Sequence, residues 1–476
     1  MSQFRTEHDS LGDLQVPAAA YYGAQTQRAI ANFPISGQPM PISFVAVHAT
    51  LKKAAAMVNR DLGLLDPRLA NAIIQACQEI RSGDPRFAAD FKAHFPVDIY
   101  QTGSGTSTNM NLNEVIANRA NEILEARDGN PVPTRSSTSG SVHPNDHVNL
   151  GQSSNDTIPT TLHVLSIWAI KNELRPGLEK LRVSLLAKSK ELWPIIKTGR
   201  THLQDATPIR LGQEFLGYAG QLERSLARLD FACTQLAEVP LGGTAVGTGI
   251  NAHPEYAQRM CQLLSEWMKV SIRESTNHFQ AQSTLDAVLM AHGVLRTIAV
   301  SLTKIANDIR WMGSGPRAGL GEIELPAVQP GSSIMPGKVN PVIAESLLMV
   351  CQRVLGNDAA LVAAATQNNF ELAMSIPLAA AIMEESICLL GKAAGNFATQ
   401  CIAGIRATDR GPALVESGLM LATALAPALG YEKAAAIAKE AAKTNRTIRD
   451  VAREMSGLSE DELTKLLDPE KMVGGS

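Results

Sequence analysis

Four segments of the chain combine small hydroxyl or amide side chains with glycine or proline, and each contains groups that can hold a carboxylate. Free backbone N–H groups, hydroxyls and a single lysine bind an anion through local donors, so the protein needs no net positive charge for this task. The segments are Thr102-Gly-Ser-Gly-Thr-Ser-Thr-Asn-Met-Asn111, His143-Pro-Asn-Asp146 with Gln152-Ser-Ser-Asn-Asp156, Gly199-Arg-Thr-His-Leu-Gln-Asp205, and Gly331-Ser-Ser-Ile-Met-Pro-Gly-Lys-Val-Asn-Pro341.

The first two segments each allow a structural and a functional interpretation. Ser104, Gly105 and Thr106 are typical of a turn followed by a helix N-cap, and the same geometry would present free N–H groups and hydroxyls to an anion. The stretch Ser153–Asn155 offers similar donors just before a helix that we expect to begin near Thr160, and it is equally typical of a helix cap. His143 lies in a Pro/Asn/Asp turn, where it is either a surface histidine or a ligand.

The last two segments contain the groups best suited to proton transfer. His202 is the one side chain of its neighbourhood that titrates near neutral pH, so it is a candidate general acid or base, although a lone histidine is more often structural. Glu345 is a candidate partner that would orient the imidazole. The loop from Gly331 to Pro341 combines hydroxyls with one cation and resembles the loops that carry catalytic groups; its polar members are Ser332, Ser333, Lys338 and Asn340.

Long helices must position these segments. Apolar residues recur three and four positions apart between Leu211 and Leu236 and again, in a near-heptad pattern, between Val288 and Ile309. The chain has no proline between Pro254 and Pro316, which leaves room for a helical bundle. We predict a mainly α protein with an N-terminal domain at 1–151, a central helical bundle at 152–408 and a small helical domain at 409–476. The apolar seams are long enough to suggest that other subunits share them.

The composition argues against several classes of protein. With 43 basic and 46 acidic residues the formal charge is −3, which offers no broad surface for nucleic acid or an anionic membrane. The six cysteines form no CxxC pair, and no dinucleotide, P-loop, zinc-protease or nucleophile-elbow motif occurs, so we expect neither a metal nor a cofactor. The N-terminus has no apolar signal core, and we expect no apolar run to reach transmembrane length. This favours a bacterial cytoplasmic protein, although a processed organellar protein would have the same features.

The four segments, in this order, resemble the signature regions of the fumarase/aspartase superfamily. The resemblance covers nearly the whole chain, from Arg5-Thr-Glu-His-Asp-Ser10 to Gly430-Tyr-Glu-Lys-Ala-Ala435. Gly337 and His202 favour class II fumarases, because aspartases typically have Ala and Gln at these positions. The resemblance implies three helical domains and a homotetramer whose central helices form one bundle, with each active site built from three subunits.

The resemblance also implies roles for individual residues. Ser332 would be the base that removes the C3 proton of malate, and His202, paired with Glu345, would act through water on the C2 hydroxyl side. The intermediate would be an aci-carboxylate, which needs preorganised donors and a cation. A dicarboxylate, fumarate or L-malate, would bind to Ser104, Gly105, Thr106, Ser153, Ser154, Asn155, Thr201, Ser333, Lys338, Val339 and Asn340. A second dicarboxylate site would comprise His143, Pro144, Asn145 and Asp146.

Departures from the family pattern and two rival functions remain open at this point. Ala373 and Ala426 stand where the family usually has asparagine, and Gly-Ile-Arg-Ala-Thr408 replaces Gly-Ile-Glu-Ala-Asn. These changes raise the question of a shifted substrate. The nearest rival is an ammonia-lyase of the aspartase type, and a rival of another class is a catalytically silent structural protein.

Overall fold

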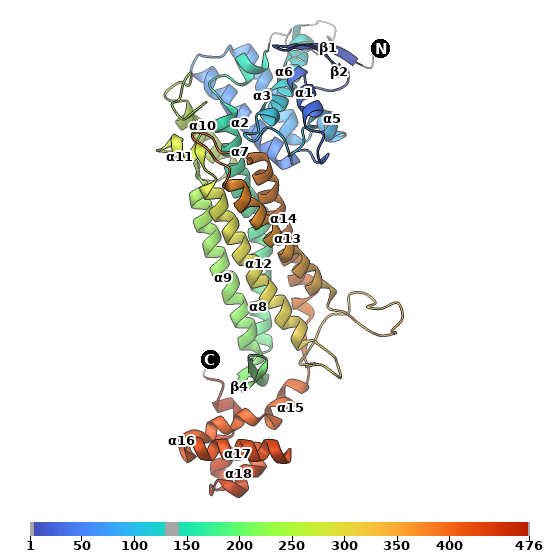
Figure 1. Cartoon of the computed structure of the whole chain (residues 1–476), viewed down its shortest axis with the longest axis vertical. Coiled ribbons are helices and arrows are strands. Elements are labelled where there is room, and N and C mark those ends of the chain that lie inside the picture. The colour runs from blue at the N-terminus through green and yellow to red at the C-terminus, as the bar shows by residue number, and fades with distance from the viewer. Residues whose placement is uncertain (1–3, 129–141, 475–476) are drawn as a thin grey trace. The chain divides into compact units, whose positions relative to one another are not determined.

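The computed structural model describes residues 4–128 and 142–474 and consists mainly of helices, accompanied by short two-stranded sheets (Figure 1). The prediction of a mainly α protein is confirmed. Residues 129–144 are rich in Gly, Pro and Ser and precede the domain boundary predicted after residue 151; they lie largely outside the described residues.

The chain divides into two compact units, each built from several stretches. The first unit comprises Met1–Leu174, Arg228–Arg296 and Arg353–Leu389, and the second comprises Arg175–Ala227, Thr297–Gln352 and Leu390–Ser476. Four long helices contribute residues to both units: α9 (Leu211–Leu236), α12 (Asp286–Met312), α13 (Val342–Ala365) and α14 (Ile376–Gln400). The three continuous domains expected from the sequence therefore stay a prediction.

In the first unit, helices α2, α3 and α6 pack side by side (Figure 1). Helix α3 shows why these residues form helices: Asp66 caps its start, Pro67 occupies the first position, and Gly83 ends it with a left-handed φ of 71°. The elements of this unit are β1 (Phe4–Asp9), β2 (Gly12–Pro17), α1 (Ala24–Asn32), α2 (Ile42–Asp61), α3 (Pro67–Ser82), α4 (Pro85–Ala88), α5 (Phe91–His94), α6 (Thr106–Asp128), the π-helix η1 (Pro144–Val148), α7 (Ser154–Ala169), the π-helix η2 (Ile170–Leu174), β5 (Glu238–Val239), α10 (Tyr256–Met268), β6 (Arg273–Glu274) and α11 (His278–Ser283).

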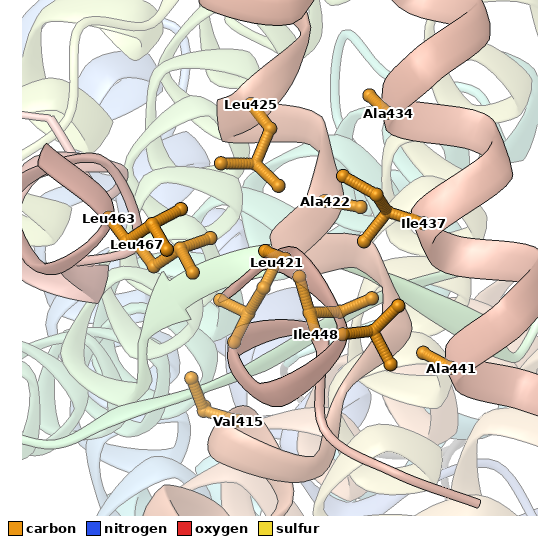
Figure 2. Packing of buried hydrophobic residues seen from close by; sticks show 12 residues of the cluster. Val415, Leu421, Ala422, Leu425, Ala434, Ile437, Ala441, Ile448, Leu463 and Leu467 are labelled. Carbon is orange, nitrogen blue, oxygen red and sulfur yellow. The ribbon is translucent and has the colours of Figure 1, made fainter. Parts of the chain in front are cut away.

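The second unit contains the antiparallel hairpin of β3 and β4 and a helical C-terminal part with its own apolar core (Figure 2). Leu421, Leu425 and Ile437 are almost fully buried there, together with Ile448 and Leu463. The elements of this unit are α8 (Arg175–Glu191), β3 (Ile196–Thr201), β4 (Gln204–Arg210), β7 (Ile323–Glu324), η3 (Ile402–Gly404), β8 (Arg406–Ala407), α15 (Arg410–Ser417), η4 (Leu419–Leu425), α16 (Ala426–Leu429), α17 (Tyr431–Thr444), α18 (Ile448–Met455), α19 (Glu460–Leu466) and η5 (Pro469–Lys471).

The apolar stripes of α9 and α12 are buried within a single subunit. Phe215, Leu222 and Leu229 on α9 are inaccessible, as are Leu295 and Leu302 on α12. The expectation that other subunits must cover these stripes was therefore wrong, because helices of the same chain already do so. A different set of apolar side chains stays exposed on the long helices: Leu216, Phe231, Val300, Trp311, Met349, Leu355 and Val362.

Two helices of the described residues, α12 and α13, are long and apolar enough by length and composition to cross a membrane, and a bent pair, Arg410–Ser417 with Leu419–Leu429, passes the same test. The expectation that no apolar run reaches that length was therefore too strong. A bundle helix reaches such hydropathy through its core-facing stripe. On α12, Arg296 and Lys304 have side chains 52% and 53% exposed, as on a helix with one face in water.

Helical glycines differ in how closely other parts of the chain approach them. A Cβ at Gly177 would lie 2.1 Å from the Gly391 carbonyl oxygen, so α8 and α14 meet there at backbone distance. By contrast, a Cβ at Gly217 or Gly220 of α9, or at Gly356 of α13, would have nothing within 4 Å apart from its chain neighbours and the backbone of its own helix.

Candidate active site

The first candidate segment and the start of α7 come together through a chain of hydroxyl groups. Ser104 Oγ lies 2.8 Å from Thr106 Oγ1, which in turn lies 2.8 Å from Ser154 Oγ. Gly105 between them has φ +76°, and a Cβ there would lie 2.8 Å from Ile158 Cγ2, so glycine is required for this close approach. The structure thus joins residues of two segments that the sequence predicted separately.

Two helix N-termini meet at this chain of hydroxyls. Helix α6 begins at Thr106 and α7 at Ser154, and the free N–H groups and positive dipole ends of such helices attract a carboxylate. Ser153 is the N-cap of α7 and forms a capping box with Asp156. The start predicted near Thr160 was therefore wrong by six residues, because the Ser-Asn-Asp sequence forms the first turn and Pro159 is accommodated inside the helix. The cap interpretation and the anion-site interpretation are compatible.

His202 lies at the tip of the β3–β4 hairpin in a strained turn. His202 and Leu203 have φ of 56° and 60°, the pattern of a type I′ turn, which usually takes Asn-Gly. A non-glycine residue with such a positive φ destabilises the folded chain by about 1–3 kcal/mol, and residues of this kind concentrate at functional sites. Since Leu203 is 68% exposed, packing of its side chain does not account for this turn.

A buried ion-pair cluster holds the strands of this hairpin. Lys197 Nζ lies 2.8 Å from Glu214 and 3.0 Å from Glu322, and Arg200 donates two hydrogen bonds to Glu322 at 3.1 and 2.8 Å. Lys197 and Glu322 are each 1% exposed. Arg200 directly precedes the candidate residues Thr201 and His202, so this cluster fixes the base of their turn.

The loop from Gly331 to Pro341 closes on itself and surrounds the Ser332 hydroxyl with backbone donors. Gly331 N donates to Lys338 O at 2.9 Å, and Asn340 Nδ2 donates to Gly331 O at 2.6 Å. Ser332 Oγ accepts from the N–H groups of Ile334 and Met335 at 3.3 and 3.0 Å. Hydrogen bonds of this kind favour the ionised form of a hydroxyl, as a base would require. The Ser333, Lys338 and Val339 side chains are exposed on the same loop.

The second predicted dicarboxylate site is a compact surface turn. His143 caps the short π-helix of Pro144–Val148, and its Nδ1 atom lies 3.2 Å from the Asp146 carboxylate. Asn145 and Asp146 are exposed. The turn is separated from the α7 start by only a few residues, so the two predicted dicarboxylate segments are neighbours in the chain.

One predicted contact, the pairing of His202 with Glu345, is not formed within the described residues of one chain. In the described part of the chain, no hydrogen bond or ion pair joins His202 to Glu345, which lies in the first turn of α13. Across residues 4–128 and 142–474, no group of three His, Cys, Asp or Glu side chains has the arrangement of a metal site.

Sequence reasoning missed one segment that contacts the site. Asn155 Nδ2 donates to Ala245 O at 2.8 Å, and Asp156 accepts hydrogen bonds from the N–H groups of Gly242 and Thr244. The sequence Gly242-Gly-Thr-Ala-Val-Gly-Thr-Gly249 has four glycines in eight residues, a signal for close backbone approach that could have identified it.

Comparisons with known proteins identify the family of the chain. Residues 12–356 match a lyase family model and residues 421–474 match the fumarase C C-terminus model. The chain is 48% identical to the class II fumarate hydratase of Nitrosomonas europaea, over 99% of this chain and 100% of that one, and 51% identical to that of Halobacterium salinarum, over 99% and 97%. The crystal structure of class II fumarase from Schistosoma mansoni superposes with a TM-score of 0.94 at 37% identity, covering 98% of this chain and 99% of that one. The chain belongs to the class II fumarate hydratase family.

Proposed function

We propose that the chain is a metal-independent fumarate hydratase, which adds water reversibly and in anti geometry to fumarate to give L-malate. The observation that carries this proposal is the Ser332 hydroxyl, which accepts two backbone N–H groups in a loop that also contains Lys338. A serine base needs a lowered pKa, and these donors favour the ionised hydroxyl.

The chemistry of malate explains why Ser332 and His202 have different roles. Ser332 removes the weakly acidic C3 proton, and His202, oriented by Glu345, acts through a water on the C2 hydroxyl. The electrons released at C3 move into the adjacent carboxylate, giving an aci-carboxylate that preorganised donors must stabilise. Ser104, Thr106 and Ser154, at the two helix N-termini, hold a substrate carboxylate. The remaining contacts come from Gly105, Ser153, Asn155, Thr201, Ser333, Lys338, Val339 and Asn340, and His143–Asp146 form a second dicarboxylate site.

We infer that the working unit is a homotetramer. Large apolar residues that stay exposed on the long helices, such as Phe231 and Val300, support this assembly, because exposed apolar surface marks contacts with a partner. The described residues of one chain form no His202–Glu345 contact, which supports a site completed by other subunits. We also propose that the chain has an N-terminal domain at 1–151, a central helical domain at 152–408 and a C-terminal domain at 409–476.

The expected setting is the cytoplasm, within the tricarboxylic acid cycle and without nucleic-acid or membrane partners. The formal charge of −3 supports the absence of a nucleic-acid partner. The charged, exposed side chains of Arg296 and Lys304 on α12 support a bundle helix rather than a membrane span.

A direct test measures absorbance in the fumarate band with purified protein and either L-malate or L-aspartate. Fumarate formation from malate alone supports the proposal, formation from aspartate alone establishes an ammonia-lyase, and no reaction with either supports a silent structural protein. Exhaustive chelation should leave malate turnover unchanged. Loss on chelation that iron or magnesium restores would contradict the metal-independent mechanism.

A further inference from the structure

The Asp156 carboxylate is fully buried and connects two segments of backbone. It accepts a hydrogen bond from Ser153 N at 3.0 Å, which completes the capping box of α7. It also accepts from Gly242 N and Thr244 N, each at 3.1 Å. Capping alone accounts for the first bond only. The other two attach the Gly242–Gly249 segment to the start of α7.

The Gly242–Gly249 segment has a strained backbone that these bonds maintain. Thr244 has φ +54°, which is unfavourable for a β-branched residue, and it is 3% exposed. Its carbonyl accepts a hydrogen bond from Gln282 Nε2 at 2.9 Å, so its N–H and C=O groups are both held. The main-chain carbonyl of Gln282 in turn accepts a hydrogen bond from the N–H group of Ala373. Ala373 is one of the residues that depart from the family pattern.

The held segment orients Asn155. Ala245, which follows Thr244 in this segment, accepts a hydrogen bond at its main-chain oxygen from Asn155 Nδ2 at 2.8 Å. Asn155 follows Ser154 in the first turn of α7, beside the hydroxyl chain of the candidate site. This hydrogen bond to a main-chain carbonyl favours the observed orientation of the Asn155 side chain.

Charge supports the same arrangement. Burial raises the pKa of Asp156 to about 6, while its three backbone hydrogen bonds and the buried Lys52 oppose that rise. Burial lowers the pKa of Lys52 to about 7, and Lys52 Nζ donates to Asn149 at 2.9 Å. The Asp156 charge also adds to the rise that burial causes in the pKa of the Tyr256 phenol. An ionised carboxylate has enough lone pairs for all three N–H groups, whereas a protonated one would turn an acceptor into a donor.

We propose that Asp156 is a positioning residue for substrate binding, which acts by fixing the Gly242–Gly249 segment and, through it, the side chain of Asn155. The inference rests on the proposed function, because Asn155 is one of the predicted substrate contacts. It goes beyond helix capping, since it assigns Asp156 an effect on ligand affinity that depends on Asn155.

The chain offers a matched control for capping. Glu462 completes the capping box of α19 and accepts from Ser459 N at 2.8 Å, as Asp156 does in α7. Glu462 belongs to the C-terminal part and to none of the candidate segments. The change Glu462→Gln therefore removes the same kind of charge from a capping box without affecting the site.

The experiment is a double-mutant cycle of Asp156→Asn and Asn155→Ala in the full-length protein. The readouts are KM for L-malate, kcat, and the Kd of succinate, a saturated dicarboxylate that binds without turnover, measured by calorimetry. We expect Asp156→Asn alone to raise KM and the succinate Kd about tenfold, but less than about twofold when Asn155 is already alanine. Glu462→Gln should change neither constant. An equal factor in both backgrounds, or no effect of Asp156→Asn, would overturn the inference, because a purely structural role predicts independent effects.

A second variant covers the case in which Asp156→Asn does not fold. Gly242→Ala keeps the charge but displaces the segment, because its Cβ would lie 2.6 Å from Ala257 Cβ at a φ of +94°. The same dependence on Asn155 is expected for this variant, and equal factors in both backgrounds would again overturn the inference. Failure of the proposed function is distinguishable, since wild-type protein would then turn over no malate while succinate binding still reports on Asp156.

Discussion

Arg200 donates two hydrogen bonds, at 3.1 and 2.8 Å, to the carboxylate of Glu322, which is 1% exposed. This pair joins the strand before the His202 turn to a residue 122 positions away in the chain. Arg200 and Lys197 together give the buried Glu322 carboxylate the hydrogen bonds and opposite charge that water would otherwise supply. Removing one member of such a cluster destabilises the folded protein.

Glu322→Gln should therefore destabilise the protein by about 2–4 kcal/mol and lower kcat/KM for malate roughly tenfold or more, because the His202 turn loses its anchor. Thermal unfolding and steady-state kinetics measure the two effects. The neighbouring Glu324 is exposed, so Glu324→Gln is the control and should change neither. Equal behaviour of the two variants would show that the cluster does not position the turn.

Ser332→Ala should preserve folding and assembly while malate turnover falls by roughly 10²–10⁴-fold, the usual contribution of a general base. The change removes one exposed-loop hydroxyl and its two backbone hydrogen bonds. Ser333→Ala on the same loop should cost less, because that residue is proposed to bind rather than to abstract a proton. Near-normal kcat in Ser332→Ala would exclude it as the base.

Mixing two inactive variants tests whether sites are shared between subunits. His202→Asn should show a clear fall in turnover and a changed pH–rate profile, smaller than the loss in Ser332→Ala, because water partly replaces an acid that acts through water. When subunits exchange between His202→Asn and Ser332→Ala tetramers, a fraction of activity should return, since some mixed sites combine two intact groups. Verified mixed tetramers without recovery would place both residues on one chain or overturn the assignment.

We expect the free energy of unfolding to decrease in acid because histidines are buried in the neutral form. Burial lowers the pKa of His48 from 6.5 to about 3, and its ring nitrogens lie 2.7 Å from Thr161 and 3.0 Å from Asn109. Between these pKa values the unfolded chain holds a proton that the folded chain lacks. The free energy of unfolding should therefore fall with pH below about 6.5, by up to about 1.4 kcal/mol per pH unit for this histidine.

Denaturant unfolding between pH 7.5 and 5 measures this slope. Asp156 makes this slope shallower. Its pKa is raised to about 6, so below that pH the folded state takes up a proton, which stabilises it relative to the unfolded chain. Comparison of variants isolates His48: the slope should be shallower in His48→Gln and unchanged in His8→Gln, whose side chain is 66% exposed. An unchanged slope in His48→Gln would contradict the assignment.

The sequence predicted features that depend on local pattern and missed those that depend on contacts between distant residues. The α9 and α12 stripes and the hydroxyls of Ser104 and Ser154 are visible as spacing and residue type. The attachment of Asp156 to Gly242 spans 86 positions, and nothing in either residue's neighbourhood specifies the other. The start of α7 was missed because Ser, Asn and Asp disfavour helix interiors but favour first turns.

The open glycines of α9 turn a single substitution into a reporter of quaternary structure. If Gly217 faces water in the working protein, Gly217→Ala should raise the free energy of unfolding by about 0.5–1 kcal/mol, because alanine is the better helix former. If another subunit fills the space that one chain leaves empty around Gly217, the added methyl group should instead weaken assembly. The sign of one stability change, measured at several protein concentrations, thus distinguishes a solvent-facing helix from one packed against a neighbour.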